Sequence, residues 1–300
     1  MSALILAILA ALCFGAGMIT SRIGLRHDDA RTGAAISIPT ATLLFVIAAP
    51  FTVELSAFNL TAALIFALVG LFYPALVTLL TFRANEELGP TVTSAISGTA
   101  PLFAMLAAAL LLGEQIPPQA TIAALGVAAG VALLSWRPGA MTGTTPGTTL
   151  DTKTGHHPGR ALVWPIAGAI VRGVAQAGAK AGLLLWGNPF AAGVIGYLVS
   201  STAVLGAEQL RRGGRKAVSR HGLLWFAATG AINGGAMVLM YSAPAVAPVS
   251  TVAPVIAAYP LVTAMASALF LRGEKISAQI ICGAVLTVTA IIYLAAFRAS

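Results

Sequence analysis

Long apolar runs dominate the sequence, separated by stretches that contain charge, proline, glycine or asparagine. A helix rises 1.5 Å per residue, so about 20 residues cross the roughly 30 Å hydrocarbon core of a bilayer. The runs are continuous and rich in Ala, Leu and Gly, which favours helices over the short alternating strands of a barrel. Ten runs are close to that length or longer, at approximately 3–21, 32–52, 61–82, 90–112, 119–136, 161–186, 189–209, 222–242, 247–271 and 277–297.

Composition excludes the soluble alternatives. The chain is 58% hydrophobic and 9% charged, with a mean hydropathy of +0.91, whereas soluble domains are about 25% charged. So few charges cannot solvate a surface of this size, which excludes a soluble fold, a disulfide scaffold and a disordered chain. A net charge of +8 would suggest nucleic acid in a soluble domain. Here we expect basic loops at a membrane and no nucleic-acid partner.

The basic residues alternate between loops. The termini and the loops after even-numbered runs carry only Arg298, and Arg172 and Lys180 fall inside the sixth run. Because cytoplasmic loops are rich in Lys and Arg, we expect the odd-numbered loops in the cytoplasm and both termini in the periplasm of a bacterial inner membrane. The fourteen basic residues of the odd-numbered loops are Arg22, Arg26, Arg31, Arg83, Arg137, Lys153, Arg160, Arg211, Arg212, Arg215, Lys216, Arg220, Arg272 and Lys275.

One long polar segment, residues 137–160, divides the chain. It is rich in Gly, Thr and Pro and has no apolar period, which predicts a flexible linker. We therefore expect one five-helix unit over 1–136 and a second over 161–300. His156 and His157 in the linker have no neighbouring ligands in sequence and are interpreted as solvated, so we predict neither a metal site nor a cofactor.

The two halves are related in sequence. Residues 101–112 read PLFAMLAAALLL and residues 260–271 read PLVTAMASALFL, and a Gly-Glu pair follows each segment. At an offset one residue smaller, Gly15 and Arg22 correspond to Gly173 and Lys180. Since each half has an odd number of spans, the second half must cross the membrane in the opposite sense. Such inverted repeats place a substrate site near the midplane and support alternating access.

Ten spans, a five-plus-five repeat and Pro-Leu-x9-Leu followed by Gly-Glu resemble the drug/metabolite transporter superfamily, in particular its EamA-type exporters. The amino-acid exporters of the YddG type are a plausible branch. The resemblance covers the whole chain. It implies a ten-helix secondary transporter, and not an enzyme, that exports small metabolites through a central site between its repeats. A fused repeat also makes a monomer sufficient. In the small four-span multidrug members a first-helix glutamate binds proton and drug, but run 3–21 here has no acid.

Titratable groups at depth are scarce. All nine Asp and Glu residues and all four His residues fall in loops or near span ends, whereas proton relays need a titratable group inside the membrane. This favours uniport or exchange of metabolites, with amino acids as the preferred class. A proton-coupled multidrug or cation antiporter remains the alternative. A membrane-embedded transferase is a remote one, with the segment His27-Asp28-Asp29 as its sole local cluster.

The sixth run contains the exceptional residue. Arg172 lies about eleven residues into it, and Arg172, Gln176 and Lys180 share one helix face at i, i+4 and i+8. A charge at that depth costs about 2.5–3.5 kcal/mol and normally faces a wet cavity. Its guanidinium suits a carboxylate-bearing substrate, although carbonyl binding at a broken helix or snorkelling would also explain it. Lys180 and Arg22 lie nearer span ends, where interfacial anchoring is expected.

Further candidates are hydroxyl, amide and phenol groups in the third, fourth, eighth and ninth runs, where small hydroxyl residues can also simply join helices. Prolines weaken a helix where they occur, so the equivalent Pro101 and Pro260 are candidate gating hinges, or else fixed kinks. The candidate substrate-binding residues are Arg172, Gln176, Tyr73, Thr78, Ser94, Ser97, Asn233, Tyr241 and Tyr259.

Overall fold

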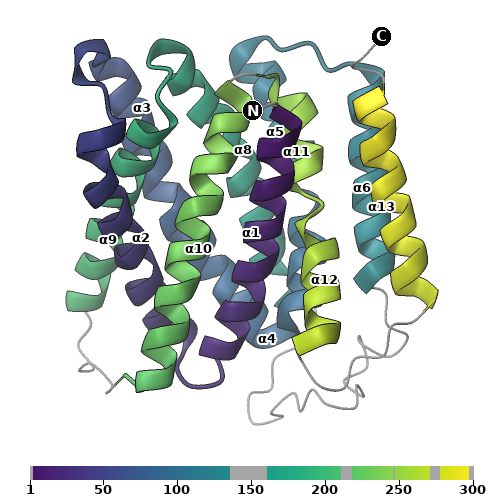
Figure 1. The fold of residues 1–300 in the computed structure, drawn as a ribbon, viewed down its shortest axis with the longest axis horizontal. Coiled ribbons are helices and arrows are strands. Elements are labelled where there is room, and N and C mark those ends of the chain that lie inside the picture. The colour runs from purple at the N-terminus through teal and green to yellow at the C-terminus, as the bar shows by residue number, and fades with distance from the viewer. Residues whose placement is uncertain (1–2, 136–160, 211–217, 246, 271–277, 297–300) are drawn as a thin grey trace.

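The computed structural model describes residues 3–135, 161–210, 218–245, 247–270 and 278–296, and its helices stand side by side in one bundle (Figure 1). All regular structure in these ranges is helical, which confirms the predicted all-α membrane fold. The polar segment 137–160, with His156 and His157, lies outside the described residues. By length and composition alone, five described stretches could cross a membrane: Ala3–Gly24, Ala30–Thr52, Leu60–Pro90, Pro189–Gln209 and Arg220–Pro244.

The first half contains α1 (Ala3–Gly24), α2 (Ala30–Thr52), the short η1 (Leu55–Ala57), α3 (Leu60–Gly70), the π-helical turn η2 (Leu71–Leu76), α4 (Val77–Ser97), α5 (Ala100–Leu112) and α6 (Pro118–Ser135). The second half contains α8 (Val163–Leu185), α9 (Pro189–Gln209), α10 (Arg220–Ala245), α11 (Val249–Ile256), α12 (Tyr259–Phe270) and α13 (Ala278–Ala296). Several predicted spans are therefore divided between two or three of these elements, and the divisions have identifiable causes.

The third span bends in its middle. Tyr73 has non-helical angles (φ −137°, ψ 116°) and Pro74 follows it, so the helical hydrogen-bond ladder is interrupted between α3 and α4. Ser200 of α9 repairs the interruption, because its hydroxyl donates to the carbonyl of Gly70 and accepts from the N–H of Ala75. A bend in lipid is tolerated when a neighbouring helix satisfies the freed backbone groups in this way.

The third span ends at Gly89, whose φ of +80° is in the left-handed region that favours glycine. The fourth span then starts at Pro90 and is interrupted after Ser97, and α5 begins at Ala100. The ninth span is interrupted after Ile256, and α12 begins at Tyr259. The two interruptions lie 159 positions apart, which is the offset of the sequence repeat.

A proline explains both interruptions. Pro101 and Pro260 are the second residues of α5 and α12, where a proline fits because the first-turn N–H groups have no helical partner. In an unbroken helix, however, each ring would clash with the carbonyl four residues earlier, at Ser97 and Ile256. Each helix therefore stops there and restarts.

Glycines let the two halves interlock. A Cβ added to Gly15 of α1 would lie 2.5 Å from the Cβ of Val262 in α12, and one added to Gly173 of α8 would lie 2.6 Å from the Cβ of Phe103 in α5. Gly15 corresponds to Gly173 in the repeat, and Phe103 corresponds to Val262. The same close contact thus occurs twice, across a pseudo-two-fold axis between the halves.

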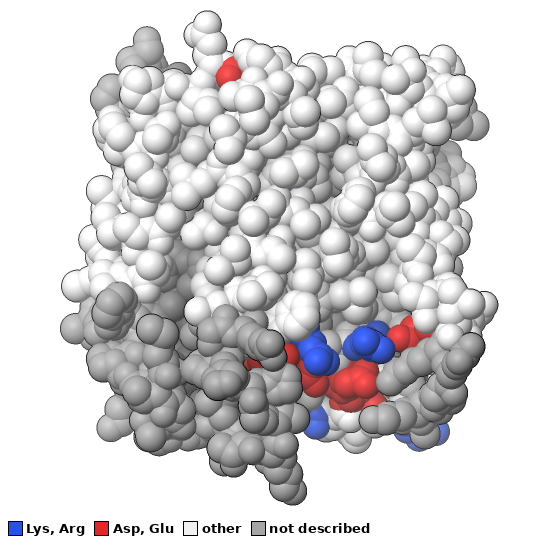
Figure 2. Space-filling model, turned by 180° about the vertical axis from the view of Figure 1, so that it is seen from behind, with Lys and Arg blue, Asp and Glu red and all other residues white. Residues whose placement is uncertain are grey.

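The outside of the bundle is apolar. Large side chains such as those of Leu64, Leu110, Leu184 and Ile292 are more than half exposed, as expected for helices whose solvent is lipid. Figure 2 shows one face on which charged side chains gather at the lower end of the molecule, with an almost uncharged surface above them.

Candidate substrate site

A pocket lies where the two interrupted helices meet. The space there is small, about that of one water molecule, and residues of both halves line it. The first half contributes α1, the end of α4 and the start of α5, and the second half contributes α8, α10, α11 and the start of α12. The lining residues are Phe14, Ser97, Ala100, Pro101, Arg172, Gln176, Met240, Ala253, Ile256, Ala257 and Tyr259.

The lining is organised by the repeat. Three pairs of equivalent positions face this space: Phe14 with Arg172, Ser97 with Ile256, and Ala100 with Tyr259. Equivalent residues of an inverted repeat can meet only near the axis that relates the halves. The pocket therefore lies on that axis, where secondary transporters built from inverted repeats hold their substrates.

Arg172 is the charged group of the pocket. It is 9% exposed, and its guanidinium carbon lies 5.5 Å from the ring centre of Phe14, 5.6 Å from that of Tyr259 and 5.8 Å from that of Tyr73. Such contacts stabilise a cation by about 0.5–2 kcal/mol each. The Nε of Arg172 has no hydrogen-bond partner within the described part of the chain.

None of the ion pairs given for the described residues involves Arg172, whose titratable neighbours are Tyr73 and Tyr259. Glu86 and Glu87 pair with Arg83 near the end of the third span, Asp28 accepts hydrogen bonds from Ser219, and Glu114 follows the end of α5. Among the described residues, therefore, no acid neutralises the guanidinium. Burying a charge without an ionised partner is costly.

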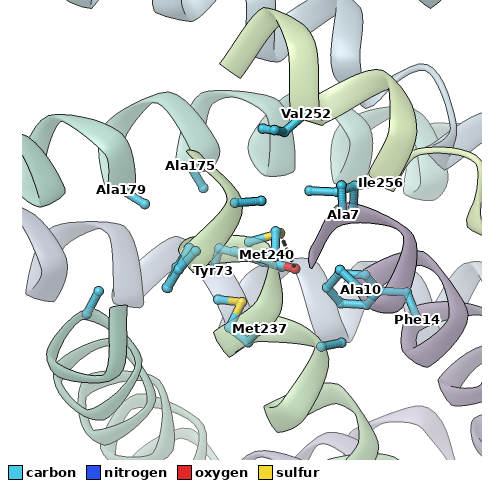
Figure 3. Packing of buried hydrophobic residues seen from close by; sticks show 14 of the residues in the cluster. Ala7, Ala10, Phe14, Tyr73, Ala175, Ala179, Met237, Met240, Val252 and Ile256 are labelled. Carbon is cyan, nitrogen blue, oxygen red and sulfur yellow. Dashed lines mark hydrogen bonds between the residues drawn. The ribbon is translucent and has the colours of Figure 1, made fainter. Parts of the chain in front are cut away.

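The neutral lining divides into a polar and an apolar part. Ser97 and Gln176 supply a hydroxyl and an amide, while Met240, Ala253 and Ile256 supply apolar surface. Figure 3 shows Phe14, Tyr73, Met240 and Ile256 converging from different helices, with the Tyr73 hydroxyl 3.8 Å from the sulfur of Met240.

The structure brings together some of the predicted residues and separates others. Arg172, Gln176, Ser97, Tyr259 and Pro101 line the pocket, and Tyr73 contacts it through Arg172. The others are not among its lining residues. Ser94 is buried three residues before the lining residue Ser97, and Pro260 is buried directly after the lining residue Tyr259. Tyr241 is buried in the core and Thr78 is half-buried. Asn233 is also half-buried and packs against Gly17 of α1.

Phe14 and Met240 line the pocket although neither was a predicted site residue. A signal for Phe14 exists in the sequence, because it is the repeat equivalent of Arg172. No comparable signal marks Met240, which is one of several apolar residues in its helix.

The two basic residues predicted as interfacial anchors have specific partners. The Nζ of Lys180 lies 2.9 Å from Oε1 of Glu114 and donates to the carbonyl of Ala247 at 2.9 Å. Its repeat equivalent Arg22 donates to the carbonyls of Asn85 at 2.7 Å and Glu86 at 3.3 Å. Both residues thus tie the first helix of their own half to the segment before an interrupted helix, and Lys180 also bridges the two halves.

Known proteins add a family assignment to this geometry. A family model described as "EamA-like transporter family" matches residues 1–136 and 159–296. No curated protein matches the sequence. A solved structure described as "Crystal structure of protein" superimposes with a TM-score of 0.74 over 98% of this chain and 96% of that chain. At 15% sequence identity, this likeness shows a shared fold alone.

Proposed function

We propose that this chain, which belongs to the EamA-like transporter family and is thus a multi-pass membrane transporter of the drug/metabolite type, transports a small metabolite that carries a carboxylate. The observation that supports this is Arg172, a guanidinium buried in the pocket between the halves with no carboxylate beside it among the described residues. A substrate carboxylate would bind it through a bidentate, charge-assisted pair.

Amino acids are the preferred substrate class. Beside the guanidinium, Ser97 and Gln176 offer acceptors for an ammonium group, and Met240 and Ile256 offer apolar surface for a side chain. Export is the direction that the resemblance to EamA-type exporters favours.

Uniport or exchange is the proposed form of transport. Proton antiport through a carboxylate requires an acid at membrane depth. The described acids nearest to the pocket in sequence are Glu87, just before the end of the third span at Gly89, and Glu114, just after the end of α5. A proton-coupled cation antiporter would also have to place its substrate beside the buried guanidinium, which repels it.

Alternating access is the proposed mechanism, with one end of the path closed by Lys180. Its ion pair with Glu114 joins α8 to the end of α5, and its hydrogen bond to Ala247 joins α8 to the segment before α11. With their side chains 13% and 15% exposed, Lys180 and Glu114 are shielded from solvent and stabilise each other more than a surface pair would. Opening that end would require this contact to break.

The proposed orientation places the end of the molecule that holds Arg22 and Arg83 in the cytoplasm, and both termini in the periplasm of a bacterial inner membrane. The distribution of Lys and Arg over the loops supports it. We also propose that the units 1–136 and 161–300, joined by the segment 137–160, act together as a monomer, since each half supplies the other's partner.

Counterflow tests this proposal. Purified protein in liposomes loaded with unlabelled L-leucine or L-aspartate, at equal pH on both sides, is expected to accumulate the labelled amino acid transiently. Flux that requires an imposed proton gradient would overturn the uniport and exchange mechanism. Uptake of organic cations without uptake of any carboxylate would favour the cation antiporter instead.

A further inference from the structure

We propose that the two helix interruptions form a carboxylate subsite, in which the backbone N–H groups of Ala100 and Tyr259 bind the substrate together with the guanidinium of Arg172. This inference rests on the proposed function, because it assumes that the transported molecule carries a carboxylate. It adds that the carboxylate lies on the pseudo-two-fold axis, between the starts of two helices from opposite halves.

The backbone of the two interruptions provides the donors. The first N–H groups of a helix have no intrahelical partner, and the positive end of the helix dipole lies there. In α5 the N–H of Leu102 is used by the carbonyl of Thr99, and Pro101 has no N–H. This leaves the N–H of Ala100 as the first-turn donor at the pocket.

The second interruption repeats this arrangement. In α12 the N–H of Leu261 is used by the carbonyl of Ala258, and Pro260 has no N–H. This leaves the N–H of Tyr259, and both Ala100 and Tyr259 line the pocket. Two helices of 13 and 12 residues thus begin at one small space, and helix starts favour anions.

Arg172 indicates a bound anion independently of the two helix starts. Its side chain lines the same space, is 9% exposed and has an Nε without a hydrogen-bond partner in the described ranges. The rings of Phe14, Tyr73 and Tyr259 surround the guanidinium without neutralising it. A carboxylate between the guanidinium and the helix starts would complete the missing pair.

The subsite predicts which part of a substrate is indispensable. The ends of α4 and α11 lie at the same interruptions, and helix ends favour cations. An ammonium group can therefore be accepted nearby, but the guanidinium of Arg172 and the two helix-start N–H groups are donors that suit the carboxylate. Loss of the carboxylate should weaken binding far more than loss of the ammonium.

The first experiment compares ligands on the full-length protein. Binding of L-leucine, L-leucinamide and 4-methylpentanoate is measured by titration calorimetry on purified transporter. L-leucine should bind, 4-methylpentanoate should bind within about tenfold of it, and L-leucinamide should bind at least about tenfold more weakly, because it lacks the charged acceptor. Equal binding of leucine and its amide would overturn the subsite.

The second experiment removes one donor without changing a side chain. Replacing Ala100 by its α-hydroxy analogue, lactate, through nonsense suppression converts the N–H into an ester oxygen. The same replacement at Ala104, one turn further along α5 and outside the pocket lining, is the matched control. The affinity for L-leucine should fall about fivefold or more at position 100 and stay within about twofold at position 104.

The outcomes separate the two proposals. If the unmodified protein binds and transports L-leucine but the ester at position 100 changes nothing, the carboxylate lies elsewhere and only the subsite is wrong. If neither L-leucine nor L-aspartate is bound or transported, the proposed function fails, and the subsite fails with it.

Discussion

The guanidinium carbon of Arg172 lies 5.5 Å from the ring centre of Phe14, and these two residues occupy equivalent positions in the two halves. An inverted repeat brings such equivalents face to face at its axis. Two arginines there would repel each other in a site of low dielectric constant, whereas an arginine and a phenylalanine attract. The charge of the pocket therefore comes from one half, and its counterpart in the other half stabilises that charge.

Arg172 is predicted to be essential for transport because of its shape as well as its charge. Arg172→Leu should abolish amino-acid counterflow. Arg172→Lys keeps the charge but loses the planar fork that matches a carboxylate and stacks on rings, so it should reduce flux at least about tenfold. The measurement is counterflow in liposomes at equal protein content, with the unfolding temperature as a check on folding. Normal flux in Arg172→Leu would remove the binding role from this residue.

The contact between Gly173 and α5 is predicted to be indispensable for packing of the halves. In Gly173→Ala the new Cβ would lie 2.6 Å from the Cβ of Phe103 and 2.7 Å from the backbone nitrogen of Ala104. Overpacking of this kind costs about 1–3 kcal/mol, which should lower the unfolding temperature in detergent. Gly206→Ala is the control, because a Cβ there meets nothing within 4 Å. Similar unfolding temperatures for the two variants would contradict the prediction.

The Lys180–Glu114 pair is predicted to keep one end of the path closed. With the native Cys13 and Cys282 replaced by serine, Ala253→Cys places a reporter in the pocket lining. Adding Lys180→Met should raise the rate of labelling by a membrane-impermeant maleimide several-fold, because that end opens more often. Arg83→Met removes a pair whose basic side chain is 48% exposed, and serves as the control. An unchanged labelling rate in the Lys180 variant would rule out the closing role.

Ser200 is predicted to stabilise the bend of the third span. Ser200→Ala would leave the carbonyl of Gly70 and the N–H of Ala75 without their partner in a buried region. Buried groups left unsatisfied cost about 1–3 kcal/mol, so the unfolding temperature should fall. The exposed Thr202 donates to the carbonyl of Val199 in its own helix, so Thr202→Ala should have little effect. If both variants unfold at the wild-type temperature, other groups must satisfy the bend.

The sequence identifies several residues of the site, but it does not determine which of the other polar candidates face the pocket. Arg172 and Gln176 were identifiable because polar residues at membrane depth are exceptional, and Ser97 was identifiable as a hydroxyl residue inside the fourth run. Tyr241 and Asn233 carry equally suitable groups, yet the structure turns them toward the core and toward Gly17. Apolar helices in lipid have no polar face to reveal their rotation, so a polar group alone does not say which way it points.

The amino-acid sequence alone determines the ten spans, because lipid requires each span to satisfy its backbone within a helix and therefore leaves a long apolar run. The order of the residues also gives the division into two related halves and the lack of an acid at depth. That Phe14 faces Arg172 and that Lys180 meets Glu114 emerges only from the folded bundle. These contacts join residues far apart in the chain, and they depend on how glycines such as Gly15 and Gly173 let helices of opposite halves approach. Close packing sets the rotation and depth of each helix, and no local pattern encodes either.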